Sequence, residues 1–253
     1  MADIARLVAL GASNLTRGFW SVVSVSRAAW GPEIQVLAAL GRGRSYGVPS
    51  RLVVRRLPGI LDSGLWRTLE TLPKLPTRAV VTDVGNDIVY GFSAEQTLAW
   101  VEEALDRLQY VTRDIILTEL PVANIQRLSH SRYLVCRSVL VPSCRLSLPQ
   151  VMERAEAVNA GLTALATARG IRLFRLDPAW YGLDPIHIRR SCWQKAWQAI
   201  LDAPGAADRG RCTLMEGLQL SLQAPERRWI LGIEQFTPQS GMLLPSGGRI
   251  WLY

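Results

Sequence analysis

The chain is poor in lysine, and its positive charge has no obvious focus. Of its 253 residues only Lys74 and Lys195 are lysines, so arginine supplies nearly all of the formal net charge of +8. A basic chain can indicate an anionic partner such as nucleic acid or an acidic substrate. Here the arginines are spread along the whole sequence, which favours a compositional bias. We therefore expect no nucleic-acid partner.

Long hydrophobic runs, an export signal and paired cysteines are also missing. No stretch approaches the ~18 apolar residues of a membrane span, and the first apolar run is too short for a signal peptide. The cysteines form no Cys-x-x-Cys pair and have no histidine near enough for a zinc set. They are Cys136, Cys144, Cys192 and Cys212. We expect a cytoplasmic protein with reduced thiols, no membrane span, no metal and no cofactor.

What the sequence does contain is an alternation of strand and helix patterns. Residues 93–108 open with the capping box Ser-Ala-Glu-Gln, residues 151–169 place apolar side chains on one stripe, and a last helix covers about 190–201. The intervening β-prone runs are nearly all apolar, as in strands covered on both faces. These runs are 6–10, 34–40, 79–84, 115–120 and 171–176. The pattern predicts an α/β fold with a doubly wound parallel sheet.

Two regions depart from this alternation. Residues 128–149 fit neither helix nor strand and are interpreted as an insertion in an α/β domain spanning 1–204. Residues 205–253 contain short apolar runs separated by Gly, Pro and Ser, which predict a small extension rich in β-hairpins. Its aromatic residues could cap a site, form a subunit contact or cover the sheet edge. They are Trp229, Phe236, Trp251 and Tyr253.

Chemically useful residues follow several of the predicted strands. Ser13 follows the first, Gly43 the second, Asn86 the third, and the pair Asp184 and His187 follows the fifth. Because ligands bind at the carboxyl ends of parallel strands, we expect these residues to meet at one sheet edge. The alternative for each residue alone is a local role, such as Ser13 or Asn14 acting as a helix N-cap.

Together these residues could carry out acyl transfer. A serine hydroxyl becomes nucleophilic when an imidazole accepts its proton, and a carboxylate orients that imidazole. The chain has only two histidines, and His187 lies three residues after Asp184 whereas His130 lies in the irregular insertion. The Ser13 amide, a glycine amide and the Asn86 side chain could stabilise the oxyanion. We expect Asp177, although close in sequence, not to be the triad acid.

These residues resemble the four motif blocks of the SGNH (GDSL-type) hydrolase family, from about residue 5 to about residue 203. The block usually written Gly-Asp-Ser is similar to Gly11-Ala12-Ser13-Asn14, with Ala12 in place of the aspartate. The block Asp-x-x-His is matched in full. The second block is similar to Gly43-Arg44-Ser45, with Gly47 as an alternative, and the third is shortened to Gly85-Asn86-Asp87.

The resemblance implies a three-layer α/β/α fold around a five-stranded parallel, flavodoxin-like sheet. It also implies Ser13 as nucleophile, His187 as base, Asp184 as the orienting acid, and Ser13, Gly43 and Asn86 as oxyanion donors. The implied substrates are small esters of many kinds, so the resemblance does not select among them.

Three residues near these loops are candidate substrate contacts. Arg42 and Arg44 flank the oxyanion side and could bind a phosphate or carboxylate, or could be solvated loop arginines. Trp180 could line an acyl pocket or pack in the core. The sequence does not indicate an oligomeric state.

We therefore expect a serine esterase that works through an acyl-enzyme. One alternative is an acyltransferase of the same fold. Another is a non-catalytic nucleotide- or nucleic-acid-binding module, although no Gly-x-Gly-x-x-Gly or Walker sequence follows the first strand. A third is an inactive relative of the family, for which Ala12 is the only support.

Overall fold

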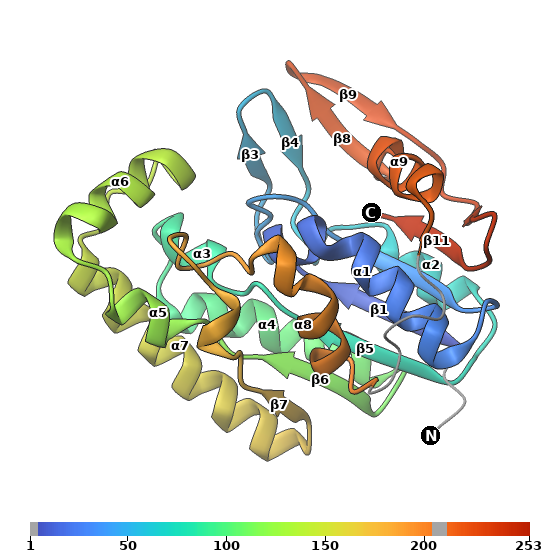
Figure 1. The fold of residues 1–253 in the computed structure, drawn as a ribbon, viewed down its shortest axis with the longest axis horizontal. Helices are drawn as coiled ribbons and strands as arrows, with labels where there is room; N and C mark the ends of the chain where they lie inside the picture. The colour runs from blue at the N-terminus through green and yellow to red at the C-terminus, as the bar shows by residue number, and fades with distance from the viewer. Residues whose placement is uncertain (1–4, 204–211) are drawn as a thin grey trace.

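The computed structural model describes residues 5–203 and 212–253, and its centre is a seven-stranded sheet (Figure 1). The strand order is β10-β11-β2-β1-β5-β6-β7, and all neighbours are parallel except β10 with β11. The five strands expected from the sequence are β1 (Arg6–Leu10), β2 (Gln35–Ala39), β5 (Thr77–Val81), β6 (Asp114–Thr118) and β7 (Arg172–Phe174). Their spatial order is the flavodoxin-like one.

The sheet has seven strands rather than five because the C-terminal region extends it. Strand β11 (Arg249–Leu252) pairs in parallel with β2, and β10 (Met242–Leu243) pairs with β11. Trp251 and Tyr253 are buried there, so of the three roles considered for these two aromatic residues the structure selects covering the sheet edge. The predicted boundary near residue 204 lies outside the described residues.

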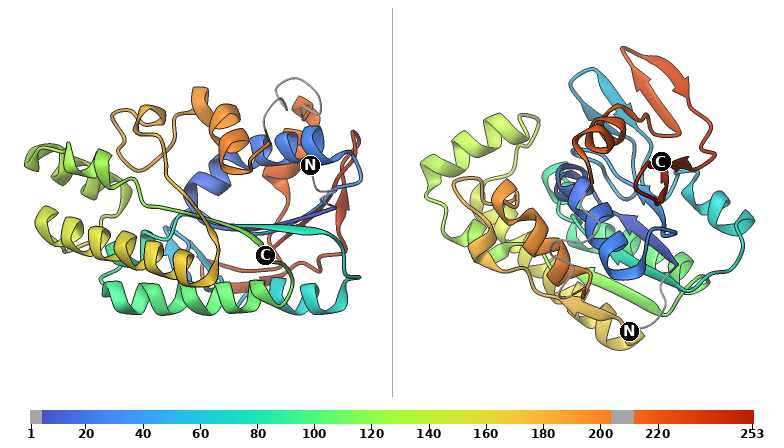
Figure 2. Two further views of the ribbon diagram at one scale, coloured as in Figure 1. Left: turned by 90° about the horizontal axis from the view of Figure 1, so that it is seen from below. Right: turned by 45° about the vertical axis from the view of Figure 1, so that its right-hand side comes forward.

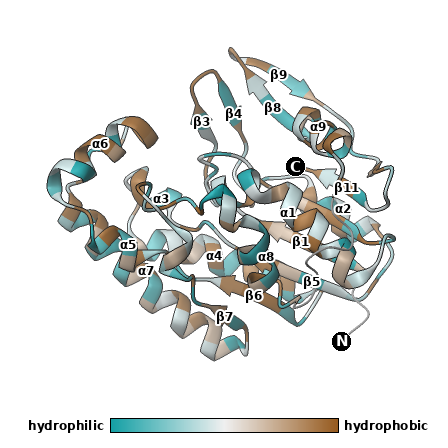
Figure 3. Ribbon diagram, viewed as in Figure 1, coloured by the Kyte–Doolittle hydropathy of each residue, from teal (hydrophilic) through white to brown (hydrophobic). Residues whose placement is uncertain are grey.

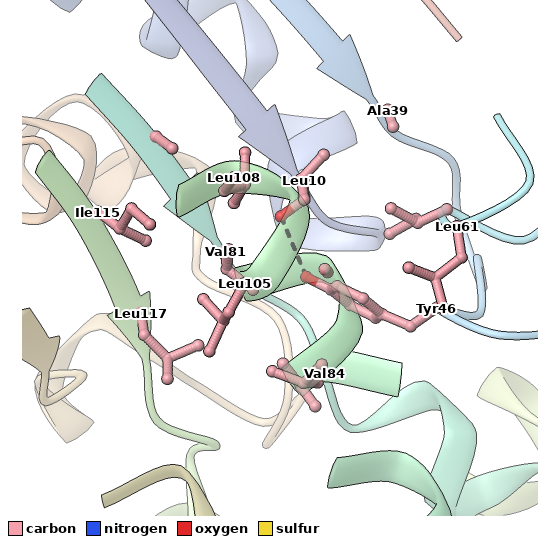
Figure 4. Packing of buried hydrophobic residues seen from close by; sticks show 14 of the residues in the cluster. Leu10, Ala39, Tyr46, Leu61, Val81, Val84, Leu105, Leu108, Ile115 and Leu117 are labelled. Carbon is pink, nitrogen blue, oxygen red and sulfur yellow. Dashed lines mark hydrogen bonds between the residues drawn. The ribbon is translucent and has the colours of Figure 1, made fainter. Parts of the chain in front are cut away.

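Helices cover both faces of the sheet, as the nearly continuous apolar strands require. Alternate side chains of β1 divide between two cores. Leu7 and Ala9 pack on the side of α1 (Ser13–Trp30) and α8 (Trp193–Ile200), whereas Val8 and Leu10 pack on the side of α2 (Leu65–Thr71), α4 (Ala94–Gln109) and α7 (Leu148–Arg169). The left view of Figure 2 shows these two helix layers above and below the sheet. In the second core the buried Tyr46 hydroxyl donates to the Leu10 carbonyl at 3.3 Å (Figure 4).

The predicted helices are present, with boundaries that follow their caps. The Ser93 hydroxyl accepts from the Gln96 amide at the start of α4, and Ser147 with Gln150 forms a capping box that starts α7 three residues before the predicted start. The 190–201 segment is a 3₁₀ turn (Arg190–Cys192) followed by α8. The helices are α1 (Ser13–Trp30), α2 (Leu65–Thr71), α3 (Asn86–Val89), α4 (Ala94–Gln109), α5 (Val122–Gln126), α6 (His130–Leu140), α7 (Leu148–Arg169), α8 (Trp193–Ile200) and α9 (Leu214–Leu222).

The expectation that 128–149 is neither helix nor strand is wrong for α6. Ser129 caps this helix by accepting from the Arg132 amide. Apolar residues on α6 point both inward (Tyr133) and outward (Val135, Val139), which hides the one-sided periodicity that identifies an amphipathic helix.

A second, four-stranded antiparallel sheet has the order β3-β4-β8-β9. Two hairpins build it, one from each half of the chain: β3 (Ser50–Leu52) with β4 (Arg55–Leu57), and β8 (Arg227–Ile230) with β9 (Ile233–Phe236). Residues 212–253 thus contain the β8–β9 hairpin, the β10–β11 pair and helix α9. Both hairpins project from the body (Figure 1).

Candidate active site

Ser13 is the first residue of α1, directly after the corner that follows β1. The corner needs Gly11, because a Cβ there would lie 2.6 Å from the Thr82 methyl group. Neither Ser13 nor Asn14 is the N-cap: the cap position is Ala12, which has no side-chain acceptor. The first amides of the helix therefore receive no acceptor from the cap residue itself.

Asp83, which sequence reasoning missed, supplies the acceptor for these amides. Its Oδ2 atom accepts from the backbone N–H groups of Ala12 (2.9 Å), Asn14 (2.9 Å) and Leu15 (3.0 Å). The carboxylate thus stabilises the positive end of α1 from the loop after β5. Asp83 has φ +59, in the left-handed region that few residues other than glycine adopt. In the sequence, the only feature that marked Asp83 was its position four residues before Asp87.

The structure brings Ser13, His187 and Asp184 together. His187 Nε2 lies 3.0 Å from Ser13 Oγ, and His187 Nδ1 lies 2.5 Å from Asp184 Oδ2. The other oxygen, Asp184 Oδ1, accepts from the amides of Ile186 (3.1 Å) and His187 (3.2 Å). The His187 side chain is only 8% exposed, so packing restricts its orientation. His130 instead starts α6 on the surface.

Asp184 is held ionised by this arrangement. Burial acts to raise the pKa of its carboxyl, but the hydrogen bond and charge of His187, with the two amide bonds, outweigh burial and lower it. Arg17 adds a guanidinium 3.9 Å from Asp184 Oδ2. An ionised acid beside Nδ1 stabilises an imidazolium that forms when Nε2 takes a proton.

Asn14 joins the serine corner to the histidine loop. Its Nδ2 donates to the Ile186 carbonyl (2.9 Å) and to Asp83 Oδ1 (2.8 Å), while its Oδ1 accepts from the Ile188 amide (2.8 Å). One side chain therefore holds the peptide groups on both sides of His187. The sequence indicated only a possible cap at this position.

We expect Asn14→Ala to lower kcat by roughly 10²-fold with little change in KM, because a displacement of about 1 Å between serine and imidazole has this effect. Separate kcat and KM values on one ester test it. Asn124→Ala, on α5 and away from these contacts, is the matched control. An unchanged kcat for Asn14→Ala would show that the loop carrying His187 keeps its position without the Asn14 side chain.

The two other predicted oxyanion donors, Gly43 and Asn86, belong to segments that are joined by hydrogen bonds. Asn86 Nδ2 donates to the Arg44 carbonyl at 3.1 Å, which orients the amide and leaves its second N–H free. Gly43 has φ +69, and its carbonyl accepts a hydrogen bond from the Tyr90 hydroxyl. The alternative, Gly47, packs so closely on Trp100 that a Cβ would lie 2.0 Å from the indole.

Asp87 holds these loops together and is fully buried. Its carboxylate accepts from the Ser45 hydroxyl and from the Tyr46 amide (3.0 Å). Burial raises the pKa of Asp87 to about 6, although both hydrogen bonds act to lower it. This carboxylate is therefore a group whose ionisation opposes folding.

A folded-state pKa above the unfolded value of 3.8 means that the native protein binds the proton more tightly. The stabilisation from protonated Asp87 is complete below about pH 4 and is lost as the pH rises through about 6. Between these limits we expect Asp87→Asn to gain up to about 3 kcal/mol in unfolding free energy relative to the parent. Urea unfolding across this range measures it, with the exposed Asp62→Asn as control. A difference in unfolding free energy between Asp87→Asn and the parent that does not change with pH would contradict the prediction.

An apolar cavity of about 130 Å³ opens beside Ser13 and Asn86. Its walls come from the loop after β5 with α3, from the segment after β6, and from α5, α6 and α7. Gly43 does not line it. Its apolar lining includes Ile88, Val89, Leu120, Ile125, Leu128, Leu140, Val141 and Val151.

The structure places the three predicted substrate contacts differently. Arg44 is fully buried and donates to the carbonyl groups of Leu40 and Pro58 and to the main-chain oxygen of Tyr253, so it is not available to a substrate. Trp180 is buried against Phe174 in the core and does not line the cavity. Both expectations are wrong because these long side chains pack inward. Arg42 is exposed but does not line the cavity.

Residues 5–203 and 212–253 contain no group of three His, Cys, Asp or Glu side chains that could hold a metal ion. Over the same residues, no helix is long and apolar enough to cross a membrane.

No model of a known protein family matches the sequence, and no curated protein matches it. Solved structures do resemble the fold. The native aryl esterase of M. smegmatis is 12% identical over 78% of this chain and 97% of its own, with a TM-score of 0.50. Another crystal structure, 14% identical over 79% of this chain and 96% of its own, reaches a TM-score of 0.51. A G-D-S-L family lipolytic protein from Veillonella parvula is 13% identical over 79% of this chain and 97% of its own, with a TM-score of 0.48. The likeness to the structures with TM-scores of 0.50 and 0.51 shows a shared three-layer α/β/α fold.

Proposed function

We propose that the protein is a serine hydrolase that cleaves carboxylic esters through an acyl-enzyme. The observation that carries this proposal is the continuous relay from Ser13 Oγ to His187 Nε2 (3.0 Å) and from His187 Nδ1 to Asp184 Oδ2 (2.5 Å). These are hydrogen-bonding distances between a nucleophile, a base and an orienting acid, the arrangement that acyl transfer requires.

In the first half-reaction His187 Nε2 takes the proton of Ser13 Oγ as the oxygen attacks the ester carbonyl carbon. The tetrahedral intermediate then breaks its bond to the leaving alcohol, whose oxygen receives the proton from His187. The acyl group stays on Ser13. In the second half-reaction His187 removes a proton from water, which attacks the acyl carbon, and Ser13 leaves with that proton.

The negative oxygen of each intermediate needs donors that are already in place. The Ser13 amide at the start of α1 and the free N–H of Asn86 Nδ2 are both next to the cavity, and the Gly43 amide is the third donor we assign. One such donor contributes about 3 kcal/mol to lowering the barrier. The hydrogen bond from Asn86 to the Arg44 carbonyl supports this role because it holds the amide in one orientation.

The cavity supports an apolar acyl group as the part of the ester that is bound. It begins at Ser13 and Asn86, where the carbonyl would lie, and continues between aliphatic side chains of α3, α5, α6 and α7. Burying each methylene of a chain there contributes about 0.8 kcal/mol. A highly polar acyl group would lose its hydration without new partners.

Filling the cavity should therefore change chain-length preference. We expect Leu140→Trp, on the cavity side of α6, to lower kcat/KM roughly tenfold for eight-carbon acyl esters while leaving acetyl esters nearly unchanged, since lost methylene contacts are worth this much. Val139→Trp is the matched control, because Val139 is the neighbouring residue, is 74% exposed and does not line the cavity. Equal losses of kcat/KM for the eight-carbon and the acetyl esters would show that the acyl group binds outside this cavity.

The test of the proposed function requires no knowledge of the substrate. A fluorophosphonate probe reacts with an activated serine, and peptide mass spectrometry locates the adduct. We expect labelling of Ser13 in the parent and loss of labelling in both Ser13→Ala and His187→Ala. A folded parent protein that is not labelled would overturn the proposal.

A further inference from the structure

The tips of the two hairpins expose aliphatic side chains next to each other. Strand β4 pairs with β8, and the Leu231 amide at one tip donates to the Val54 carbonyl at the other (2.9 Å). Val53 is 79% exposed, Leu231 75% and Ile233 69%. Figure 3 shows both tips as hydrophobic ends on hairpins that project from the molecule. We define the tip surface as residues 52–54 and 231–233.

The backbone keeps these side chains in an unusual conformation. Val53 has φ +54 and Leu231 has φ +51, both in the left-handed region. A β-branched residue is rare there, and Asn or Gly would be the ordinary choice. Both hairpins thus carry an aliphatic residue at a turn position where a polar one is typical.

Arginines occupy the strands behind the tip surface. The strands of this sheet contain Arg51, Arg55, Arg56, Arg227 and Arg228. The only acidic residue in those strands is Glu234, which is already paired with Arg227. The exposed Arg42 adds to this field: burial first, and then the charges of Arg42 and Arg228, lower the pKa of Arg55. The surface therefore has an excess of positive charge behind an apolar edge.

We propose that the tip surface docks on an anionic lipid surface, with the aliphatic tips entering the acyl boundary and the arginines contacting headgroup phosphates. Apolar insertion combined with basic residues at the headgroup level is the physical basis of peripheral membrane binding. The β3–β4 hairpin begins at Ser50, directly after the loop that carries Gly43, so docking would bring this loop toward the lipid.

Other partners fit the surface less well. A protein–protein interface of ordinary size needs about 800 Å² on each partner and a face of matching shape, whereas two narrow projecting tips offer a few side chains. Single-stranded nucleic acid would need aromatic rings to stack on, and residues 52–54 and 231–233 contain none. In the strands behind the tips, the Trp229 ring is covered by Arg56 and Arg227, and Phe236 lies at the end of the hairpin opposite its tip.

The test uses co-sedimentation of the full-length protein with vesicles of phosphatidylcholine alone or containing about 30 mol% phosphatidylglycerol. The variant is Val53→Asn with Leu231→Asn, which removes the apolar groups and places at both left-handed positions a residue that tolerates them. We expect salt-sensitive binding to the anionic vesicles, little binding to the neutral ones, and a loss of roughly tenfold or more in the double variant. Tyr110→Ser, at an exposed aromatic residue following α4, should bind as the parent does.

The proposal would be overturned by no binding of the parent, by equal binding to both vesicle types, or by unchanged binding of the double variant. Self-association that the double variant abolishes would assign the surface to a second copy of the chain and also overturn it. Ser13→Ala should bind vesicles normally, so this inference and the proposed esterase activity fail separately.

Discussion

Replacing Asp184 with asparagine is expected to lower kcat by about 10⁴-fold on any ester that the protein cleaves. Asp184 Oδ1 accepts two loop amides, so the asparagine oxygen would remain there and its Nδ2 would face His187 Nδ1. Two donors cannot face each other, so the imidazole would carry its proton on Nε2 instead. That tautomer cannot accept the proton of Ser13.

Asp177→Asn is the matched control for this change. Asp177 is also an acid beside the histidine loop, but its Oδ1 accepts from the Ala179 amide at 2.8 Å and caps a 3₁₀ turn (Pro178–Trp180). We expect its kcat to change less than about twofold, since an asparagine oxygen can cap equally well. Steady-state rates and thermal midpoints of both variants provide the measurement. Loss of turnover in Asp177→Asn with normal turnover in Asp184→Asn would reverse the assignment of the acid.

The second large effect is expected at Asp83. Asp83→Ala would leave the buried amide of Ala12 and those of Asn14 and Leu15 without their acceptor and would release the Asn14 side chain. We expect the unfolding free energy to fall by about 4 kcal/mol, because charge-assisted hydrogen bonds at a helix N-terminus are lost together. The turnover number should also fall by roughly 10²-fold as Ser13 loses its position.

Backbone conformation has to be separated from the carboxylate in this experiment. Asp83→Gly relaxes the positive φ but also lacks the acceptor, so it should lose activity as Asp83→Ala does. Asp202→Ala provides the matched control: Asp202 also has a positive φ (+51), but it is exposed at the end of α8 and pairs with Arg172. Urea unfolding and kcat together test the prediction. Normal turnover in Asp83→Gly would show that the carboxylate does not position Ser13.

Asp83 also bears on the departure at Ala12. The sequence has alanine where the SGNH motif has aspartate, which raised the alternative of an inactive relative. In the structure a carboxylate is nevertheless present at the serine corner, and it comes from the loop after β5. The motif aspartate is therefore absent at position 12 along the sequence, but Asp83 supplies a carboxylate at the same corner from another loop.

The local patterns of the sequence were sufficient for the main elements of the fold. Nearly continuous apolar runs indicated the five strands β1, β2, β5, β6 and β7, the predicted capping box at Ser93 located α4, and an apolar stripe located α7. The three-residue spacing of Asp184 and His187 also lies within one loop, so their contact needs little tertiary information. Alternation of strand and helix then predicted the parallel sheet, since short connections allow few other topologies.

Long-range contacts were beyond the reach of such patterns. Asp83 and Asn14 are ordinary polar residues in sequence, and their roles arise from bonds across 69 and 172 positions. The pairing of β11 with β2 joins residues 214 positions apart (Arg249 with Gln35), and that of β4 with β8 joins residues 175 positions apart (Arg55 with Ile230). Arg44 and Trp180 were misassigned because the direction of a side chain depends on what packs around it.

The sequence by itself therefore determined the class of fold, the positions of five of its strands along the chain and the residue types of a serine relay, because these depend on local periodicity and short spacing. Only the tertiary structure decided how the serine corner is held, where the apolar cavity lies and which face exposes the hairpin tips. Those features depend on which distant segments pack together, and packing is set by the complementarity of whole surfaces.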